Sequence, residues 1–223
     1  AAALGASGAV VYGLDHVGHG RSDGERALVA DFDPVVEDLH LVVERAGGEH
    51  PGLPVVLVGH SMGGLIGTRY AQRHGEGLAG LVLSAPVVGN PGTGALLGLD
   101  PLPEIPIDPA ILSRDEATRR AYVDDPLVYH GPFKRPTLAA MAGALLDAAL
   151  DAKAVRVPVL WQHGEADALV PLAGSRRLIE LLDNAEVSVR HYPGARHEIF
   201  NETNRDEVLA DTASFVERCA APA

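Results

Sequence analysis

The sequence has 223 residues, of which 47% are hydrophobic and 4% aromatic, and its formal net charge is −12 at pH 7. This length suits one domain with a large aliphatic core, and the negative charge argues against nucleic acid or an anionic membrane as a partner, because phosphates would be repelled. The single cysteine, Cys219, excludes an internal disulfide and a cysteine-rich metal site, and no apolar run reaches the ~20 residues of a membrane-spanning helix.

The first 50 residues predict a helix end, a strand, a loop and a helix. Residues 1–8 are typical of a helix tail with a glycine stop, and the apolar run 9–14 predicts a strand. A polar, glycine-rich loop follows over 15–24. A helix is then predicted from Asp33, a good N-cap residue, to the glycine pair 47–48, because apolar residues recur there at helical spacing.

The clearest local pattern is a strand, a sharp turn and a helix over residues 54–70. Four consecutive apolar residues, 55–58, are typical of a buried parallel strand. Residues 59–63 match G-x-S-x-G, whose glycines allow a tight, strained turn that lifts the Ser61 hydroxyl above the sheet. Apolar residues then follow at helical spacing: Met62, Leu65, Ile66 and Tyr70. The pattern predicts that Ser61 is a nucleophile.

The alternation of strands and helices stops after an apolar strand at 81–83. Residues 87–155 are rich in proline in their first half, and helices are predicted over 113–122 and 138–150. Insertions at the carboxyl ends of strands face the ligand crevice of an open α/β sheet. We therefore expect residues 87–155 to form a cap or lid, the alternative being a surface excursion without a role.

The alternation resumes after the insertion, and Cys219 is expected to be a small core residue in the last helix. The predicted elements are strands over 157–161 and 186–192, the second nearer the sheet edge, and helices over 171–182 and 208–219. Strand–helix repeats indicate a mostly parallel sheet with helices on both faces. We therefore predict an α/β core that combines residues 1–86 and 156–223, and the serine turn on such a core is typical of the α/β-hydrolase fold.

Three residues can supply the chemistry of a serine nucleophile. A serine hydroxyl needs a base to take its proton and an acid to orient that base. In α/β-hydrolases the chain order is serine, acid, histidine. Asp167 and His197 follow Ser61 in this order, each in a loop after a predicted strand and therefore at the same edge of the sheet. Glu165, two residues before Asp167, is the alternative acid.

Other polar groups near this edge have simpler interpretations. His16, His19, His60 and His163 are expected to brace loops or to pack, His163 within its own loop. Because they lack a metal-ligand spacing such as H-x-x-x-H, we expect no catalytic metal, and no other cofactor is indicated. The backbone N–H of Met62, at a helix N-terminus, is the expected oxyanion donor. The loop that normally supplies a second donor is not found in the sequence.

Several motifs add a resemblance to a known family. They are residues 14–24, 59–64, 112–115, 125–128, 163–167 and 192–198. With them the sequence is similar to the monoacylglycerol lipase family of α/β-hydrolases, grouped with the serine aminopeptidase-like lysophospholipases, up to about Cys219. The resemblance implies Ser61, Asp167 and His197 as the catalytic triad and a lipid-facing cap. Val17 stands where the family usually has arginine, which is expected to loosen its loop.

We therefore expect a serine carboxylester hydrolase that cleaves monoacylglycerols or similar single-chain lipid esters through an acyl-enzyme on Ser61. The same triad would serve a lysophospholipase, a general esterase or an acyltransferase. A non-catalytic binding module with this fold is the alternative of another class. A cytoplasmic protein with transient membrane or micelle contact through the cap is expected, while secretion and the oligomeric state stay open.

The resemblance to this family also implies a gap in the sheet. Family members carry strands and an oxyanion loop before the point where this sequence starts, and one of these strands lies between the segments 9–14 and 55–58. Without it, backbone groups of both neighbours lack partners, at about 1–3 kcal/mol each where they are buried. We therefore expect the sequence to be a fragment, or residues outside it to complete the sheet.

Overall fold

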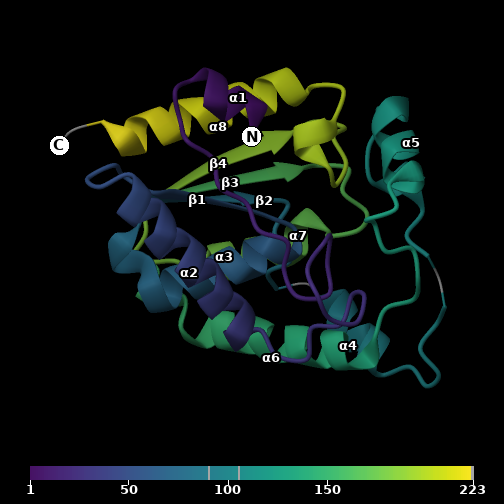
Figure 1. Ribbon diagram of the computed structural model, residues 1–223. Helices are drawn as coiled ribbons and strands as arrows, with labels where there is room; N and C mark the ends of the chain where they lie inside the picture. The colour runs from purple at the N-terminus through teal and green to yellow at the C-terminus, as the bar shows by residue number, and fades with distance from the viewer. Residues whose placement is uncertain (90, 105, 222–223) are drawn as a thin grey trace.

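A computed structural model describes residues 1–89, 91–104 and 106–221, and its centre is a parallel sheet of four strands (Figure 1). The strands, in spatial order, are β1 (Val56–His60), β2 (Gly80–Ser84), β3 (Val159–Gly164) and β4 (Val187–Tyr192). In the register, Leu81 of β2 lies beside Leu57 on one side and Val159 on the other. Each of these strands begins and ends within three residues of its predicted bounds, and β4 lies at the sheet edge as predicted.

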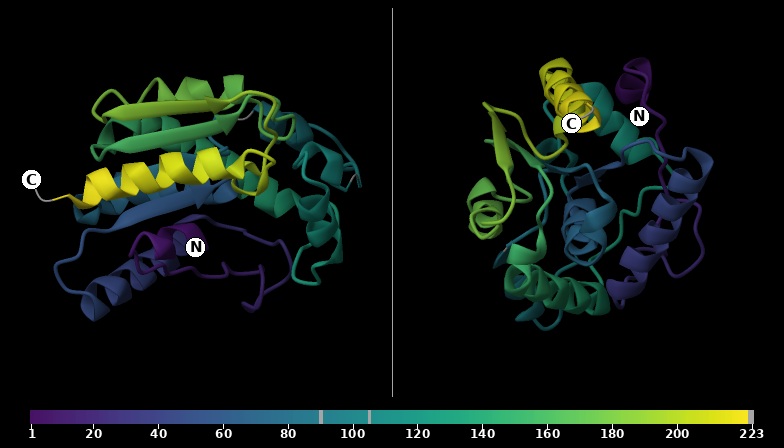
Figure 2. Two further views of the ribbon diagram at one scale, coloured as in Figure 1. Left: turned by 90° about the horizontal axis from the view of Figure 1, so that it is seen from above. Right: turned by 90° about the vertical axis from the view of Figure 1, so that its left-hand side faces the viewer.

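Helices cover both faces of the sheet, as the alternating pattern predicted. α8 (Arg205–Ala220) lies on one face with α1 (Ala2–Ala6) beside it, and the other face carries α2 (Asp33–Glu49), α3 (Met62–His74), α6 (Arg135–Leu150) and α7 (Leu172–Ile179) (Figures 1 and 2). β2 is buried on both sides: Leu81 and Leu83 belong to the main core with α3, whereas Val82 packs with Phe215 of α8. This double cover explains why the strands read as continuous apolar runs.

The described part of the predicted cap segment, residues 87–155, contains three α-helices with different positions. α4 (Pro91–Leu97) and α5 (Glu116–Asp124) lie near the end of the sheet toward which the strands point (Figure 1). α6 instead runs along the helical layer, where Ala144 and Ala148 join the main core. The bounds of the cap itself stay a prediction. Four short 3₁₀ turns complete the elements: η1 (Gly75–Gly77), η2 (Pro109–Ile111), η3 (Ala152–Ala154) and η4 (Ile199–Asn201).

The strand predicted over residues 9–14 does not form. Across the described residues β1 pairs only with β2, and the segment 9–14 pairs with no strand. Val10 and Val11 are 57% and 44% exposed. An apolar run becomes a strand only when a neighbour supplies the ladder of backbone hydrogen bonds, and no such neighbour lies beside it here. Tyr12 is instead held by side chains, those of Glu49 and His50.

Two predicted helix ends also differ from the structure. α2 continues through the glycine pair to Glu49, because the Ala46 carbonyl still accepts the N–H of His50 at 2.9 Å. α5 is capped by Asp115, whose side chain accepts the N–H of Thr118 at 2.9 Å. The hydroxyl oxygen of Ser113, the first residue of the predicted helix, accepts the N–H of Asp115 instead. No helix within the described ranges is both long enough and apolar enough to cross a lipid bilayer.

Candidate active site

Ser61 lies in a strained turn between β1 and α3. Its backbone φ is +54°, in the left-handed region that non-glycine residues rarely adopt. Such a conformation costs about 1–3 kcal/mol and persists only where the surroundings hold it. Here the N–H of Ser61 donates to the Ser84 carbonyl at 3.0 Å, and its own carbonyl accepts the N–H of Val87 at 2.9 Å. The end of β2 therefore fixes the serine at the carboxyl edge of the sheet.

The two glycines of the G-x-S-x-G turn are not equivalent. A Cβ on Gly59 would lie 2.7 Å from the carbonyl carbon of Gly63, whereas a Cβ on Gly63 would meet nothing within 4 Å. We expect Gly59→Ala to lower the free energy of unfolding by about 3 kcal/mol, because backbone atoms cannot yield as a side chain does. Gly63→Ala, the matched control, should leave stability unchanged or raise it by up to about 1 kcal/mol. Urea unfolding followed by Trp161 fluorescence measures both, and equal midpoints would contradict this account.

A continuous hydrogen-bond chain links the three predicted catalytic side chains. Nε2 of His197 lies 2.9 Å from Oγ of Ser61, and Nδ1 of His197 lies 2.8 Å from Oδ2 of Asp167. His197 and Asp167 are buried, at 2% and 7% exposure. The serine comes from the β1–α3 turn, the aspartate from the loop after β3 and the histidine from the loop after β4. This geometry suits proton transfer from the hydroxyl to the imidazole, since both distances are within hydrogen-bond reach.

The surroundings of Asp167 keep it ionised. Burial by itself raises its pKa, but hydrogen bonds to His163 and His197 and from the Val170 N–H outweigh burial, and the pKa lies well below its usual range. Its Oδ1 accepts the N–H groups of Leu169 and Val170 at 2.9 and 2.8 Å. Oδ2 is thereby left to face His197.

The structure shows which of the two carboxylates, Asp167 or Glu165, contacts His197. Glu165 is exposed, and it is Asp167 that contacts His197. His163 braces the same loop as predicted, because its Nε2 lies 2.9 Å from the Val170 carbonyl. Trp161 donates its indole N–H to Nδ1 of His163 at 3.2 Å, so the proton of a neutral His163 is on Nε2, which lies 2.9 Å from the Val170 carbonyl and 3.3 Å from Oδ2 of Asp167.

The remaining histidines differ in their surroundings. His19 braces its own loop, with Nδ1 2.9 Å from the Val17 carbonyl, as predicted. Nδ1 of His16 is buried and has no hydrogen-bond partner among the described residues, and burial lowers the pKa of this imidazole. His60 lies beside the site: its ring is 4.8 Å from that of His197, and its Nε2 is 3.2 Å from a carboxylate oxygen of Glu198.

Glu198 is a site residue that the sequence analysis missed. Burial raises its pKa, but the hydrogen bond with His60 and the nearby His197 outweigh burial and lower the pKa to about 2. His60 precedes Ser61 and Glu198 follows His197, so this contact joins the two segments that carry the nucleophile and the base. The only available signal was the position of Glu198 directly after the predicted base.

Two predictions on oxyanion donors and metals remain predictions. Met62 is the first residue of α3, so its backbone N–H has no acceptor four residues back in the helix and is free for an oxyanion. Among the described residues, His60, His197 and Glu198 have ligand atoms within 4.8 Å of one another. These three residues also take part in the hydrogen bonds described above, and the expectation of no catalytic metal stays a prediction.

The fold and the site together define a class. A serine on a G-x-S-x-G turn lies at the carboxyl edge of a parallel sheet, and it is hydrogen-bonded to a histidine that is hydrogen-bonded to an aspartate. This is the arrangement of a serine ester hydrolase with the α/β-hydrolase fold. The profile of the family described as Serine aminopeptidase, S33 matches residues 1–204. The chain therefore belongs to this family.

Known relatives agree with this assignment. The chain is 38% identical over 228 residues to a monoacylglycerol lipase of Mycolicibacterium smegmatis, covering 96% of this chain and 80% of the relative. It is 34% identical over 204 residues to the human monoglyceride lipase, covering 86% and 67%. The crystal structure of a monoacylglycerol lipase from Paleococcus ferrophilus superimposes with a TM-score of 0.81 at 28% identity, covering 97% and 86%. The predicted resemblance and the predicted α/β-hydrolase fold are thereby confirmed, and the chain is a carboxylic ester hydrolase.

Proposed function

We propose that this chain hydrolyses monoacylglycerols through an acyl-enzyme on Ser61, with His197 as the base and Asp167 as the acid that orients it. The observation that carries the proposal is the hydrogen-bond chain from Ser61 through His197 to Asp167, with distances of 2.9 and 2.8 Å. The substrate class is supported by the relatives, which are named as monoacylglycerol and monoglyceride lipases.

The geometry suggests the order of steps. Oγ of Ser61 attacks the ester carbonyl while Nε2 of His197 accepts its proton. The N–H of Met62 stabilises the oxyanion, and His197 then returns the proton to the leaving glycerol oxygen. Water, deprotonated by His197, hydrolyses the acyl-enzyme and releases the fatty acid. Asp167 stays ionised throughout and stabilises the imidazolium.

Apolar side chains on the insertion fit a lipid substrate. Large hydrophobic residues are exposed there, among them Leu99, Val123, Leu127 and Phe133. Contiguous exposed apolar surface marks sites of lipid or protein contact, and these residues are candidates for such a site. We therefore propose that residues 87–155 include a cap that touches a micelle or membrane transiently while the substrate enters, and that the enzyme works in the cytoplasm.

A substrate profile tests this function. Purified protein is assayed with 1-monoacylglycerols of 8 to 18 carbons, the matching diacylglycerols, lysophosphatidylcholine and p-nitrophenyl butyrate. We expect kcat/KM to be highest for a monoacylglycerol and at least tenfold lower for diacylglycerol and lysophosphatidylcholine. A preference for lysophosphatidylcholine would favour a lysophospholipase, and activity on the short ester alone would favour a general esterase. Products formed by acyl transfer to an added alcohol in excess of hydrolysis would favour an acyltransferase.

The non-catalytic alternative is separated by a different measurement. A fluorophosphonate labels a serine only where a base activates it. Stoichiometric labelling of folded protein supports the enzyme. Folded protein without labelling and without turnover would favour a binding module.

A further inference from the structure

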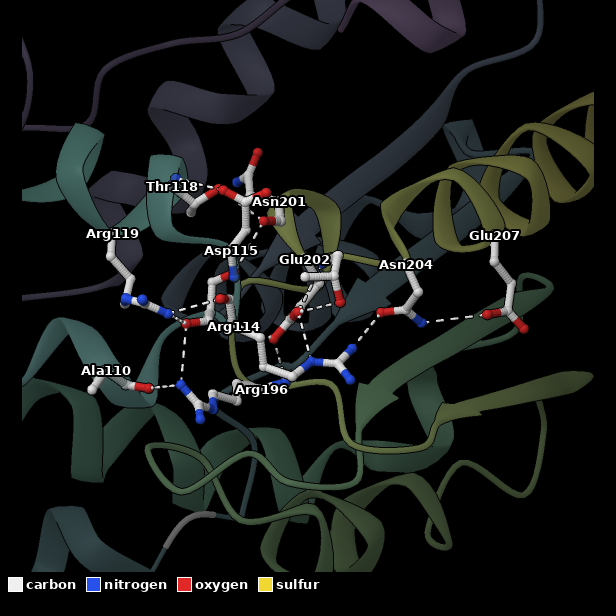
Figure 3. Close-up of polar contacts among 12 residues, drawn as sticks. Ala110, Arg114, Asp115, Thr118, Arg119, Arg196, Asn201, Glu202, Asn204 and Glu207 are labelled. Carbon is white, nitrogen blue, oxygen red and sulfur yellow. Dashed lines mark hydrogen bonds and ion pairs between the residues drawn. The ribbon is translucent and has the colours of Figure 1, made fainter.

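Glu202 is a buried charge that the proposed reaction does not use. Its side chain is fully buried, yet it stands five residues after His197 in the loop before α8. One carboxylate oxygen accepts the backbone N–H groups of Arg114 and Arg196 at 2.9 and 3.0 Å. The other accepts Nε of Arg114 at 2.9 Å and the N–H of Thr203 at 2.8 Å (Figure 3). A charge without access to water is tolerated only when it is paired in this way.

These donors keep the carboxylate ionised. Burial raises the pKa of Glu202, but the hydrogen bonds from Thr203, Arg114 and Arg196 outweigh burial and lower it. Both oxygens are therefore acceptors only: four of their contacts use N–H donors, and the Thr203 hydroxyl donates a fifth hydrogen bond at 3.4 Å. A neutral amide at this position would place its own NH₂ group against one of these donors, so the cluster is specific for a carboxylate.

One of these donors is the N–H of Arg196, the residue before His197. Both neighbours of His197, Arg196 and Glu198, also bind carbonyl groups of the segment 110–113. The Arg196 side chain donates to the carbonyls of Ala110 and Ser113 (Figure 3). On the other side of His197, the N–H of Glu198 donates to the Leu112 carbonyl at 2.8 Å. The backbone on both sides of His197 is thus held by hydrogen bonds, and Glu202 joins the two segments because it binds the N–H groups of both Arg196 and Arg114.

The same cluster reaches the start of α5 in the predicted cap. Nη2 of Arg114 donates to the Asn204 side chain at 2.9 Å. The hydroxyls of Ser113 and Thr118 both donate to the Asn201 carbonyl, at 3.1 and 2.9 Å. Segments that lie more than 80 residues apart in the sequence are therefore one hydrogen-bonded unit, and the base and the beginning of α5 share an anchor.

We propose that Glu202 is a positioning residue: by binding the N–H of Arg196 it keeps Nε2 of His197 within reach of Ser61, and through Arg114 it couples this position to the insertion. This inference rests on the proposed function. A displacement of about 1 Å in a catalytic group can lower the rate about 100-fold.

The first test is the substitution Glu202→Gln in the whole chain. Hydrolysis is measured with p-nitrophenyl butyrate, a soluble short-chain ester whose binding should depend little on the cap. We expect kcat to fall about 10- to 100-fold with KM within twofold, and the rate constant of fluorophosphonate labelling to fall in parallel. Glu202→Asp, which keeps the carboxylate, should recover at least a third of the lost activity on a logarithmic scale. Should Glu202→Gln fail to fold, Arg114→Lys replaces it, with an expected three- to tenfold fall in kcat, since the backbone contacts of Glu202 remain.

The matched control is Arg69→Gln. Arg69 is 8% exposed and contacts Gln72, Asp147 and Asp151 at the α3–α6 contact, with Nη1 2.9 Å from Asp151. This substitution removes the ion pairs of a buried guanidinium with the half-exposed carboxylates of Asp147 and Asp151, so it should lower thermal stability while kcat stays within twofold. A fall in kcat after Glu202→Gln no larger than that after Arg69→Gln would overturn the proposal.

A proton NMR measurement separates this inference from the function itself. The low-field resonance of the His197 Nδ1–H proton reports its hydrogen bond to Asp167 and requires no turnover. We expect it to shift or broaden in Glu202→Gln and to stay unchanged in Arg69→Gln. If the wild-type protein neither labels nor turns over, the proposed function fails, and this resonance alone decides: a change supports the positioning role, and an unchanged resonance refutes it.

Discussion

Ser61→Ala is expected to lower kcat for ester hydrolysis about 10⁴- to 10⁶-fold, with KM nearly unchanged. The reason is chemical: the only atom lost is the oxygen that lies 2.9 Å from Nε2 of His197 and attacks the ester. Alanine fits the turn, since it adds no atom, so the variant should fold. Steady-state hydrolysis of a monoacylglycerol and fluorophosphonate labelling measure the effect, and labelling should vanish.

The control for this experiment is Ser22→Ala, in the glycine-rich loop. The Ser22 hydroxyl donates to the Asp15 carbonyl at 2.6 Å and touches neither His197 nor Asp167. The Ser22→Ala variant should have a fluorophosphonate labelling rate and a kcat within twofold of the wild-type values. If Ser61→Ala retains more than a tenth of the activity while Ser22→Ala loses it, the nucleophile has been assigned wrongly.

Asp167→Asn is expected to lower kcat about 10⁴-fold while the fold is retained. The backbone N–H groups of Leu169 and Val170 would hold the amide oxygen of asparagine in the place of Oδ1. The amide NH₂ group would then face Nδ1 of His197, which must become the acceptor. The proton of the imidazole would move to Nε2, and that nitrogen could no longer take the proton from Ser61.

Glu165→Gln is the control in the same loop. Its side chain is exposed and Asp167, not Glu165, contacts His197, so we expect kcat within twofold of the wild type. Circular dichroism should show both variants folded. A large loss in Glu165→Gln together with a small loss in Asp167→Asn would exchange the roles of the two carboxylates.

Most of the core could be predicted because its signals are local. Continuous apolar runs predicted β1, β2 and β3, since residues covered on both faces leave no polar alternation, and the alternating pattern of residues 186–192 predicted the edge strand β4. The segment 9–14 carries the same signal without becoming a strand, because pairing depends on a neighbour and not on the segment itself. Local pattern thus predicts the capacity to pair, and only the neighbourhood decides whether pairing occurs.

The candidate site divides in the same way. Ser61 could be predicted from its turn, and the order of Asp167 and His197 from loops that follow strands. Asp167 was preferred to Glu165 in the sequence only by its place in their common loop; in the structure the amides of Leu169 and Val170 orient Asp167, and it is Asp167 that contacts His197. Glu198 and Glu202 were missed, because nothing local distinguishes a carboxylate held by distant residues from the many exposed ones.

The sequence by itself determined the parallel α/β core, the serine turn and the chain order of the three predicted catalytic residues, because each depends on neighbours within a few residues. The tertiary structure alone decided which carboxylate meets His197, where Glu198 and Glu202 lie, and that the segment 9–14 stays unpaired. These outcomes depend on contacts between residues far apart in the chain, whose energies arise only after the sheet and its loops are assembled.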